Sequence, residues 1–122
     1  MVFGTFDGLH PGHRYVLDQA SARGDLYVVI ARDTTVERLK HKIPKQTEVE
    51  RHTAIQKVYP KARVLLGDPK DYLVPVRGVK PDLVLLGYDQ HLPPGVTEQA
   101  LGCPIERLEP FHPEKYKSSL QQ

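Results

Sequence analysis

The sequence predicts a three-layer α/β domain built on a five-stranded, mostly parallel sheet. Near-continuous apolar runs at residues 26–31 and 82–87 are typical of strands that are covered on both faces. Segments with helical spacing or helix-start residues stand between the apolar runs. Because strands alternate with helices, we expect right-handed βαβ crossovers that place helices on both faces of one parallel sheet.

The first predicted elements are a short strand, a helix and a longer strand. Residues 2–3 are shorter than a usual strand, so either this strand is unusually short or residues are missing ahead of it. Helical spacing covers residues 13–22, with Pro11 suited to the first turn and Gly24 to the helix end. The β-branched run at 26–31 predicts the second strand.

The second half of the chain continues the alternation. Thr47 and Glu50 have the spacing of a capping box, which predicts a helix through Val58. After a strand at 63–67, Asp68-Pro69 offers a cap and a first-turn proline, so we expect a helix that Pro75 shortens or kinks. The remaining elements are a strand at 82–87, a short helix at 96–101 and a weak strand at 104–108.

Length and composition describe one domain, residues 1–122. Of the 122 residues, 39% are hydrophobic and 26% are charged, which is enough apolar sequence for a buried core. No run of about 18 apolar residues could span a membrane, and the first residues lack the basic-then-apolar order of a secretory signal. We therefore expect a cytoplasmic protein with no membrane partner.

Cysteine content and charge exclude further classes of protein. Cys103 is the single cysteine, which rules out an internal disulfide framework and a cysteine-built zinc site, and we interpret it as a packing residue. The formal net charge is +2 and the isoelectric point is near 8.7. This balance is too weak for an obligate nucleic-acid binder, although a local basic patch could still hold phosphates.

The junction between the first strand and the first helix is suited to an anion. Ligands of such sheets bind beyond the carboxyl ends of the strands, where unpaired N–H groups and the helix dipole attract phosphate. Gly4 lets the backbone approach a ligand without a Cβ in the way. His10 and His13 are three residues apart, so both can face one ligand and donate hydrogen bonds to it.

Two other interpretations of this junction stay open. The segment contains neither the dinucleotide pattern G-x-G-x-x-G nor the P-loop pattern G-x-x-x-x-G-K. It could therefore be a helix-capping loop that carries two surface histidines. A zinc site is less well supported, because no third ligand is evident nearby.

Gly4-Thr5-Phe6-Asp7 followed by His10-Pro11-Gly12-His13 resembles the HxGH signature of the cytidylyltransferase-like nucleotidylyltransferases, and the resemblance extends over essentially the whole chain. Ala31-Arg32-Asp33 and Gly87-Tyr88-Asp89-Gln90-His91 look most like the archaeal-type FAD synthases. The resemblance implies a Rossmann-like fold. It also implies an enzyme that transfers AMP from ATP to FMN, with FAD and pyrophosphate as products.

The alternative within the same superfamily is a cytidylyltransferase that uses CTP with glycerol 3-phosphate or a similar alcohol phosphate. A second alternative is a nucleotide-binding module that no longer turns over. Mg²⁺ is expected mainly on the substrate phosphates, with no protein metal ligand assigned, because Mg²⁺ commonly binds through substrate oxygens. Relatives are often homodimers, and a homodimer is expected on that ground alone.

The resemblance implies roles for individual residues. His10, His13 and Lys42 would be catalytic, since relatives carry a mobile lysine that contacts the reacting phosphates. Lys40 is the next candidate, because a one-residue shift in the alignment would exchange it with Lys42. The residues implied in nucleotide binding are Gly4, Thr5, Phe6, His10, Pro11, Gly12, His13, Lys40, Arg51, Gly87, Tyr88, Asp89, Tyr116, Ser118 and Ser119.

Three further features carry alternatives. The basic residues between Arg38 and Lys45 are either a solvated, mobile loop or a segment that closes over a triphosphate. Asp33 either orients a substrate hydroxyl or caps the next turn. Ser118 or Ser119 could cap a last helix, which we expect to be short or truncated because the family's usual arginine and glycine are missing there.

Overall fold

The structure is a computed structural model that describes residues 1–88, 90–92 and 95–110. Five strands form one sheet in the order β3-β2-β1-β4-β5, and every neighbouring pair is parallel. This confirms the predicted five-stranded parallel sheet. The strands are β1 (Val2–Gly4), β2 (Tyr27–Ile30), β3 (Arg63–Leu66), β4 (Val84–Leu86) and β5 (Ile105–Arg107).

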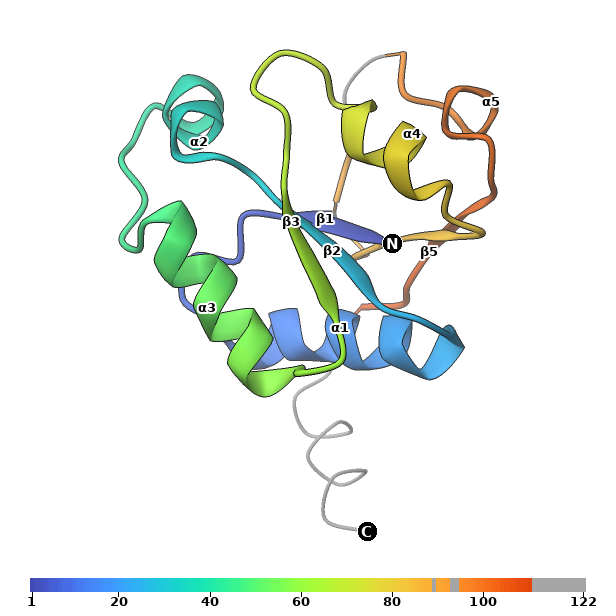
Figure 1. The fold of residues 1–122 in the computed structure, drawn as a ribbon, viewed down its shortest axis with the longest axis horizontal. Coiled ribbons are helices and arrows are strands. Elements are labelled where there is room, and N and C mark those ends of the chain that lie inside the picture. The colour runs from blue at the N-terminus through green and yellow to red at the C-terminus, as the bar shows by residue number, and fades with distance from the viewer. Residues whose placement is uncertain (89, 93–94, 111–122) are drawn as a thin grey trace, which may run out of the picture.

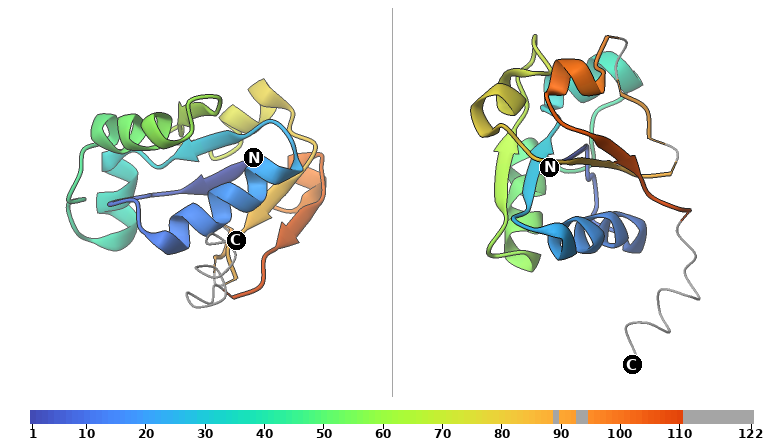
Figure 2. Two further views of the ribbon diagram at one scale, coloured as in Figure 1. Left: turned by 90° about the horizontal axis from the view of Figure 1, so that it is seen from below. Right: turned by 90° about the vertical axis from the view of Figure 1, so that its right-hand side faces the viewer.

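Helices cover both faces of the sheet. In Figures 1 and 2, α1 and α3 lie on one face, and α4 and α5 lie on the other, which gives the three predicted layers. None of the helices in the described ranges is long and apolar enough to cross a membrane. The helices are α1 (Pro11–Arg23), α2 (Asp33–Lys40), α3 (Glu48–Val58), α4 (Val74–Val79) and α5 (Glu98–Leu101).

Each face of the sheet has its own apolar cluster. Leu17 of α1 and Ile55 of α3 are fully buried against Val28 of β2. The next residue, Val29, points to the other face and joins the cluster of α4 that contains Val76. Successive residues of a strand point to opposite faces, so a strand between two helical layers must be apolar at every position. Burial of each such side chain stabilises the fold by about 1.5–3 kcal/mol.

The helix ends follow the predicted capping residues. Helix α1 starts at Pro11 and is followed by Gly24, as expected. At the start of α3, the Thr47 hydroxyl accepts a hydrogen bond from the Glu50 N–H at 3.1 Å, and the Glu50 carboxylate accepts one from the Thr47 N–H at 3.0 Å. The predicted capping box is therefore present, and α3 ends at Val58 as predicted.

The helix that was predicted to begin at Asp68-Pro69 begins later, at Val74. Asp68 does act as a cap, since its carboxylate accepts hydrogen bonds from the N–H groups of Lys70 and Asp71, but it closes a turn. Proline has no N–H to donate to the carbonyl four residues earlier, so a helix can begin around Pro75 but cannot run through it unbroken. Pro75 therefore lies in the first turn of α4 instead of kinking a longer helix.

The basic segment after β2 is partly helical. Arg38 and Lys40 lie in α2, which the interpretation as a loop did not predict. The helix ends at His41, whose left-handed backbone (φ 55°) accompanies a hydrogen bond from its N–H to the Glu37 carbonyl. Only the second half of the basic segment is therefore a loop between α2 and α3.

Candidate active site

The order of the strands places the β1–α1 junction at the centre of the carboxyl edge of the sheet. The chain first builds β1, β2 and β3 outward on one side of β1, and then returns to add β4 and β5 on the other side. The strand order therefore reverses between β1 and β4, where open α/β sheets bind ligands. Many of the residues that were predicted to bind nucleotide lie at the β1–α1 junction, from the end of β1 to the first turn of α1, or in the loop after β4.

Phe6 shapes the turn that follows β1. Its backbone is left-handed (φ 54°), a conformation that is strained for a residue other than glycine. Its ring is buried, packs edge-on against the His13 ring at 5.2 Å between centroids, and fills the space beside Gly4. A Cβ on Gly4 would lie 2.8 Å from the Phe6 ring. Gly4 is thus required by the packing of Phe6, whereas the sequence suggested that it makes room for a ligand.

His10 and His13 form a reciprocal capping box at the start of α1. Nδ1 of His10 accepts hydrogen bonds from the N–H groups of Gly12 at 3.1 Å and His13 at 3.4 Å. In return, Nδ1 of His13 accepts one from the N–H of His10 at 3.4 Å. The two rings stack with centroids 3.6 Å apart. The two histidines therefore cap the helix, as one of the interpretations predicted, and the same hydrogen bonds orient both imidazoles.

This capping determines which ring nitrogen can donate. A nitrogen that accepts a hydrogen bond carries no proton, so a neutral ring with Nδ1 as acceptor holds its proton on Nε2. Each neutral ring therefore has one N–H donor, on Nε2, and the His13 ring has a hydrogen bond with the Gly8 backbone in this structure.

Burial lowers the pKa of His13 from its ordinary value of 6.5 to about 4. The charge of His10 lowers it further, against a hydrogen bond with the Gly8 backbone that raises it. His13 is therefore neutral at pH 7 in the folded chain, which agrees with the tautomer that the capping box requires.

The pKa of His13 makes the stability of the fold depend on pH. Between about pH 4 and 6.5 the unfolded chain binds a proton that the folded chain does not, so stability falls as the pH falls through this window. We measure the free energy of unfolding with urea at pH 7 and at pH 5. The decrease from pH 7 to pH 5 should be smaller in a His13→Gln variant than in the parent chain. Glutamine keeps the capping bond to the His10 N–H. An unchanged pH dependence would contradict the lowered pKa.

Arg51 lies at the centre of the site, with none of its surface exposed. Its guanidinium donates to the carbonyls of Thr5 at 2.9 Å, Ala31 at 2.7 Å and Gln46 at 3.2 Å. It also forms a 2.6 Å ion pair with the Asp33 carboxylate. Each nitrogen of the guanidinium is bonded to protein, so Arg51 joins three loops. The role in nucleotide binding that the resemblance implies for Arg51 stays a prediction. Asp33 pairs with Arg51 through one carboxylate oxygen and keeps 33% of its side chain exposed, so its role toward a substrate hydroxyl stays a prediction.

A second link joins the β1–α1 junction to the loop before α3. The Asp7 carboxylate accepts hydrogen bonds from the N–H groups of Lys45 and Gln46, both at 2.8 Å. The Gln46 side chain accepts one from the Gly8 N–H at 3.0 Å. The bond from the Lys45 backbone is the main reason why the pKa of Asp7 is lowered. These bonds hold the loop before α3 against the turn between β1 and α1.

The two candidate lysines occupy different places. The Lys40 ammonium donates to the Thr5 hydroxyl at 3.1 Å, directly over the glycine turn. Lys42 is exposed, and within the described part of the chain it has no hydrogen bond or ion pair. The structure therefore brings Lys40 to the junction, while the resemblance had ranked Lys42 first.

The loop after β4 closes the other side of the site. Gln90 donates from its amide to the Phe3 carbonyl at 2.7 Å, so the loop is tied to β1. Gly87 donates its N–H to the Gln90 side chain at 3.1 Å, and the Tyr88 side chain is 52% exposed. The predicted nucleotide-binding residues that lie outside the described part of the chain are Asp89, Tyr116, Ser118 and Ser119.

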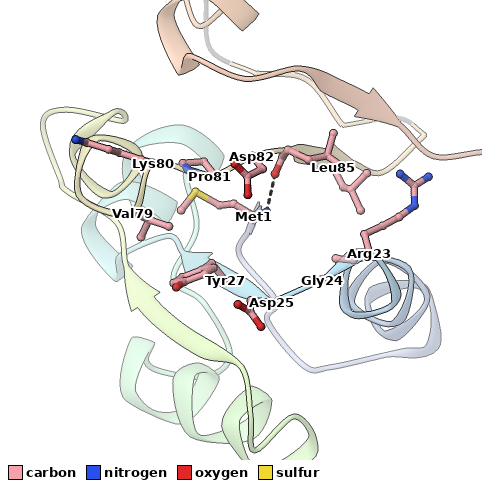
Figure 3. A pocket seen from close by; sticks show the side chains of 12 residues that line it. Met1, Arg23, Gly24, Asp25, Tyr27, Val79, Lys80, Pro81, Asp82 and Leu85 are labelled. Atoms are coloured by element: carbon pink, nitrogen blue, oxygen red, sulfur yellow. Dashed lines mark hydrogen bonds between the residues drawn. The ribbon is translucent and has the colours of Figure 1, made fainter.

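A pocket of about 250 Å³ lies at the opposite edge of the sheet. Figure 3 shows it between the end of α1 at Arg23 and the segment around Asp82, where the Met1 ammonium donates to the Leu83 carbonyl at 2.8 Å. Its lining residues Asp25 and Asp82 precede β2 and β4. The pocket is therefore at the amino ends of the strands and does not belong to the site built around the histidines.

Several contacts within this site were not predicted. The links made by Asp7, Gln46 and the pair of Arg51 with Asp33 join segments that are 18 or more positions apart. The one signal in the sequence is an arginine one helical turn after the Thr47 cap, on the face of α3 that also contains the buried Ile55. An arginine there requires a buried partner, but the sequence cannot identify that partner.

Comparisons with known proteins identify the family of the chain. The profile of the cytidylyltransferase-like family matches residues 1–108. The chain is 45% identical over 100 residues to the FAD synthase of Methanosarcina mazei, and the aligned segment covers 80% of this chain and 64% of that protein. It is 38% identical over 117 residues to the FAD synthase of Methanopyrus kandleri, and the aligned segment covers 88% of this chain and 77% of that protein.

A solved structure has the same fold. The crystal structure of the lipopolysaccharide core biosynthesis protein from Thermoplasma volcanium GSS1 superposes with a TM-score of 0.79 at 33% identity, over 91% of this chain and 97% of that one. The chain spans less than two thirds of the length of the Methanosarcina relative, at 64%. Because the family profile extends from β1 through β5 and includes both histidines, this chain belongs to the cytidylyltransferase-like family.

Proposed function

We propose that this chain transfers AMP from ATP to FMN, forming FAD and pyrophosphate. Curated relatives named FAD synthase, at 38% and 45% identity, support this choice of nucleotide and acceptor. The structural observation that carries the proposal is the reciprocal capping of His10 and His13, which fixes both imidazoles with their Nδ1 atoms on the backbone. A pair of fixed hydrogen-bond donors beside a helix N-terminus suits a reaction that transfers a phosphoryl-linked group.

In the proposed reaction an FMN phosphate oxygen attacks the α-phosphorus of ATP. The bond from the α-phosphorus to the bridging oxygen breaks, and pyrophosphate leaves with its electron pair. The attacking phosphate is already anionic, so no general base is needed. Catalysis then depends on positioning and on neutralising charge at the α-phosphoryl oxygens and the leaving group. The Nε2–H groups of His10 and His13 would supply donors there, together with the backbone N–H groups of Thr5 and Phe6.

Mg²⁺ would enter with the nucleotide. The residues that the structure describes contain no cluster of three or more histidine, cysteine or acidic side chains that could hold a metal. The Asp7 carboxylate, in the junction itself, is already bonded to two backbone N–H groups. The proposal is therefore that Mg²⁺ is held mainly by the phosphate oxygens of the nucleotide, a mode of binding that is common for this ion. Its contribution when bound would be to neutralise charge on the phosphates.

A matrix of substrates tests the proposal. Pyrophosphate release is measured with ATP or CTP, each combined with FMN, glycerol 3-phosphate and phosphopantetheine, and the products are separated by chromatography. Formation of FAD from ATP and FMN alone is the expected result. Activity with CTP and an alcohol phosphate would replace the proposal with a cytidylyltransferase. Nucleotide binding without product in any combination would indicate a non-catalytic module.

The positions of the two lysines predict different effects. We expect Lys40→Ala to lower kcat more than Lys42→Ala, because Lys40 already lies at the Thr5 hydroxyl and has only to move from it to a phosphate. Both substitutions remove one exposed positive charge, so each serves as the matched control of the other. The measurement is kcat at saturating ATP and FMN. A larger loss in Lys42→Ala would show that the loop after α2 rearranges when nucleotide binds.

A further inference from the structure

The loop after β4, defined here as Gly87, Tyr88 and Gln90, is held by a residue that neither the sequence nor the comparisons pointed to. Arg107, the last residue of β5, donates from one guanidinium nitrogen to the carbonyls of Gly87 at 3.1 Å, Tyr88 at 3.1 Å and Gln90 at 2.6 Å. Arg107 pairs in register with Leu86, the last residue of β4. Its side chain is therefore placed to reach over the point where the chain leaves the sheet.

The same loop is tied to β1 by a second side chain. Gln90 accepts from the Gly87 N–H at 3.1 Å and donates to the Phe3 carbonyl at 2.7 Å. Phe3 immediately precedes Gly4 and the turn that carries the histidines. The β4 loop is thus bonded to β5 through Arg107 and to β1 through Gln90, and its position relative to the histidines is set by these two contacts.

The partners of Arg107 are all neutral carbonyl oxygens. In the described ranges no carboxylate forms an ion pair with it, although the neighbouring Glu106 pairs with Arg23 at 2.6 Å. An arginine that serves only to hold a strand would be satisfied by one such carboxylate. A planar guanidinium that collects three carbonyls of one short loop instead determines the shape of that loop.

We propose that Arg107 is a positioning residue for the nucleoside half of the nucleotide, acting through the β4 loop. This inference rests on the proposed function and on the nucleotide-binding role that the resemblance implies for Gly87 and Tyr88, whose exposed ring offers a face on which a base could stack. A loop that is already ordered in the free protein loses less conformational freedom when a ligand binds, so its preorganisation raises affinity. Removal of Arg107 should therefore weaken nucleotide binding and leave the phosphate chemistry at the histidines intact.

The expected effect divides between KM and kcat. In Arg107→Ala we expect the Kd and KM for ATP to rise about tenfold, while kcat at saturating ATP changes by less than about twofold. Chymotrypsin should also cleave faster after Tyr88, because a loop that is released from its contacts is more accessible to protease. Arg107→Lys keeps the charge and part of the bonding, so it should restore both properties in part and in parallel.

The matched control is Arg23→Ala. Arg23 bonds to Glu106, the residue next to Arg107 in β5, and within the described part of the chain it forms no hydrogen bond or ion pair with the β4 loop. Its loss therefore tests the attachment of the strand alone. It should leave ATP affinity and cleavage after Tyr88 unchanged. Gln90→Ala should resemble Arg107→Ala. In the double variant the loss of ATP affinity should not exceed the loss in one single variant, because both residues hold the same loop.

Three results would overturn the proposal. The first is an Arg107→Ala variant that binds ATP as tightly as the parent chain. The second is weakened binding without faster cleavage after Tyr88, which would mean that Arg107 acts directly by its charge. The third is an equal loss in Arg23→Ala. Nucleotide affinity is measured by calorimetry without an acceptor, so a parent chain that binds ATP but forms no FAD defeats the proposed function and still allows Arg107 to be judged.

Discussion

Replacement of either histidine is expected to lower kcat by about 10²-fold or more while the fold survives, the cost of losing one donor to the transition state. His10 and His13 are held by each other's backbone N–H groups, so their remaining N–H donors are presented in fixed positions. Fixed donors need no reorganisation as charge develops on the α-phosphoryl oxygens, which is why their contribution is large. The measurement is kcat for FAD formation in His10→Ala and His13→Ala.

The capping role requires a control, because His10→Ala also removes the N-cap of α1, at a cost of about 1 kcal/mol in stability. Asparagine is a good N-cap, and its side-chain oxygen can accept the hydrogen bonds from the Gly12 and His13 N–H groups that His10 now accepts. His10→Asn should therefore match the parent chain in urea unfolding and still lose turnover. If His10→Asn turns over near the parent rate, His10 is a helix cap and nothing more, and the proposed catalytic role is wrong.

The second large effect is expected for stability. Arg51→Met should lower the free energy of unfolding by about 3–5 kcal/mol, because it leaves the Asp33 carboxylate and three carbonyls without their donor. Arg51 has no exposed surface, so its loss removes donors from the interior, whereas the Asp33 carboxylate, 33% exposed, can still be solvated. Urea unfolding at pH 7 measures this change.

Arg38→Ala is the control for this experiment. Arg38 is an exposed arginine that also donates to a carbonyl, that of Pro69, and its replacement should change stability by less than about 0.5 kcal/mol. Arg51→Lys should fall between the two, because one ammonium cannot reach all four oxygens that the guanidinium now contacts. A loss in Arg51→Met no larger than that of Arg38→Ala would mean that the three loops hold together without Arg51.

The residues near the histidines show why the sequence could predict the location of the site but not its internal contacts. The HxGH segment and the capping box at Thr47 are local patterns, since each depends on neighbours three residues away in the chain. Lys40 and Lys42 are the same residue type, two positions apart, so the sequence does not distinguish them. Only the packing of α2 against the β1–α1 junction brings Lys40 to Thr5. The resemblance therefore could not choose between them.

Gly4 and Pro75 illustrate the same limit. The sequence shows that Gly4 is small and that Pro75 lacks an N–H, but the consequence of each depends on what lies beside it. The Phe6 ring occupies the space next to Gly4, and the turn around Asp68 moves the start of α4 to Val74. Both outcomes follow from the geometry of a single turn, which short-range patterns leave open.

From the sequence alone follow the alternation of strands and helices, the buried character of the strands and the phosphate-suited start of α1, because periodicity and helix capping are local properties of a chain. Only the tertiary structure decided the strand order β3-β2-β1-β4-β5, the burial of Arg51 and the contact of Arg107 with three carbonyls. These depend on which distant segments become neighbours. That choice is made by packing two apolar layers against one sheet, and every charged group near the sheet edge must then find its partner within the geometry that results.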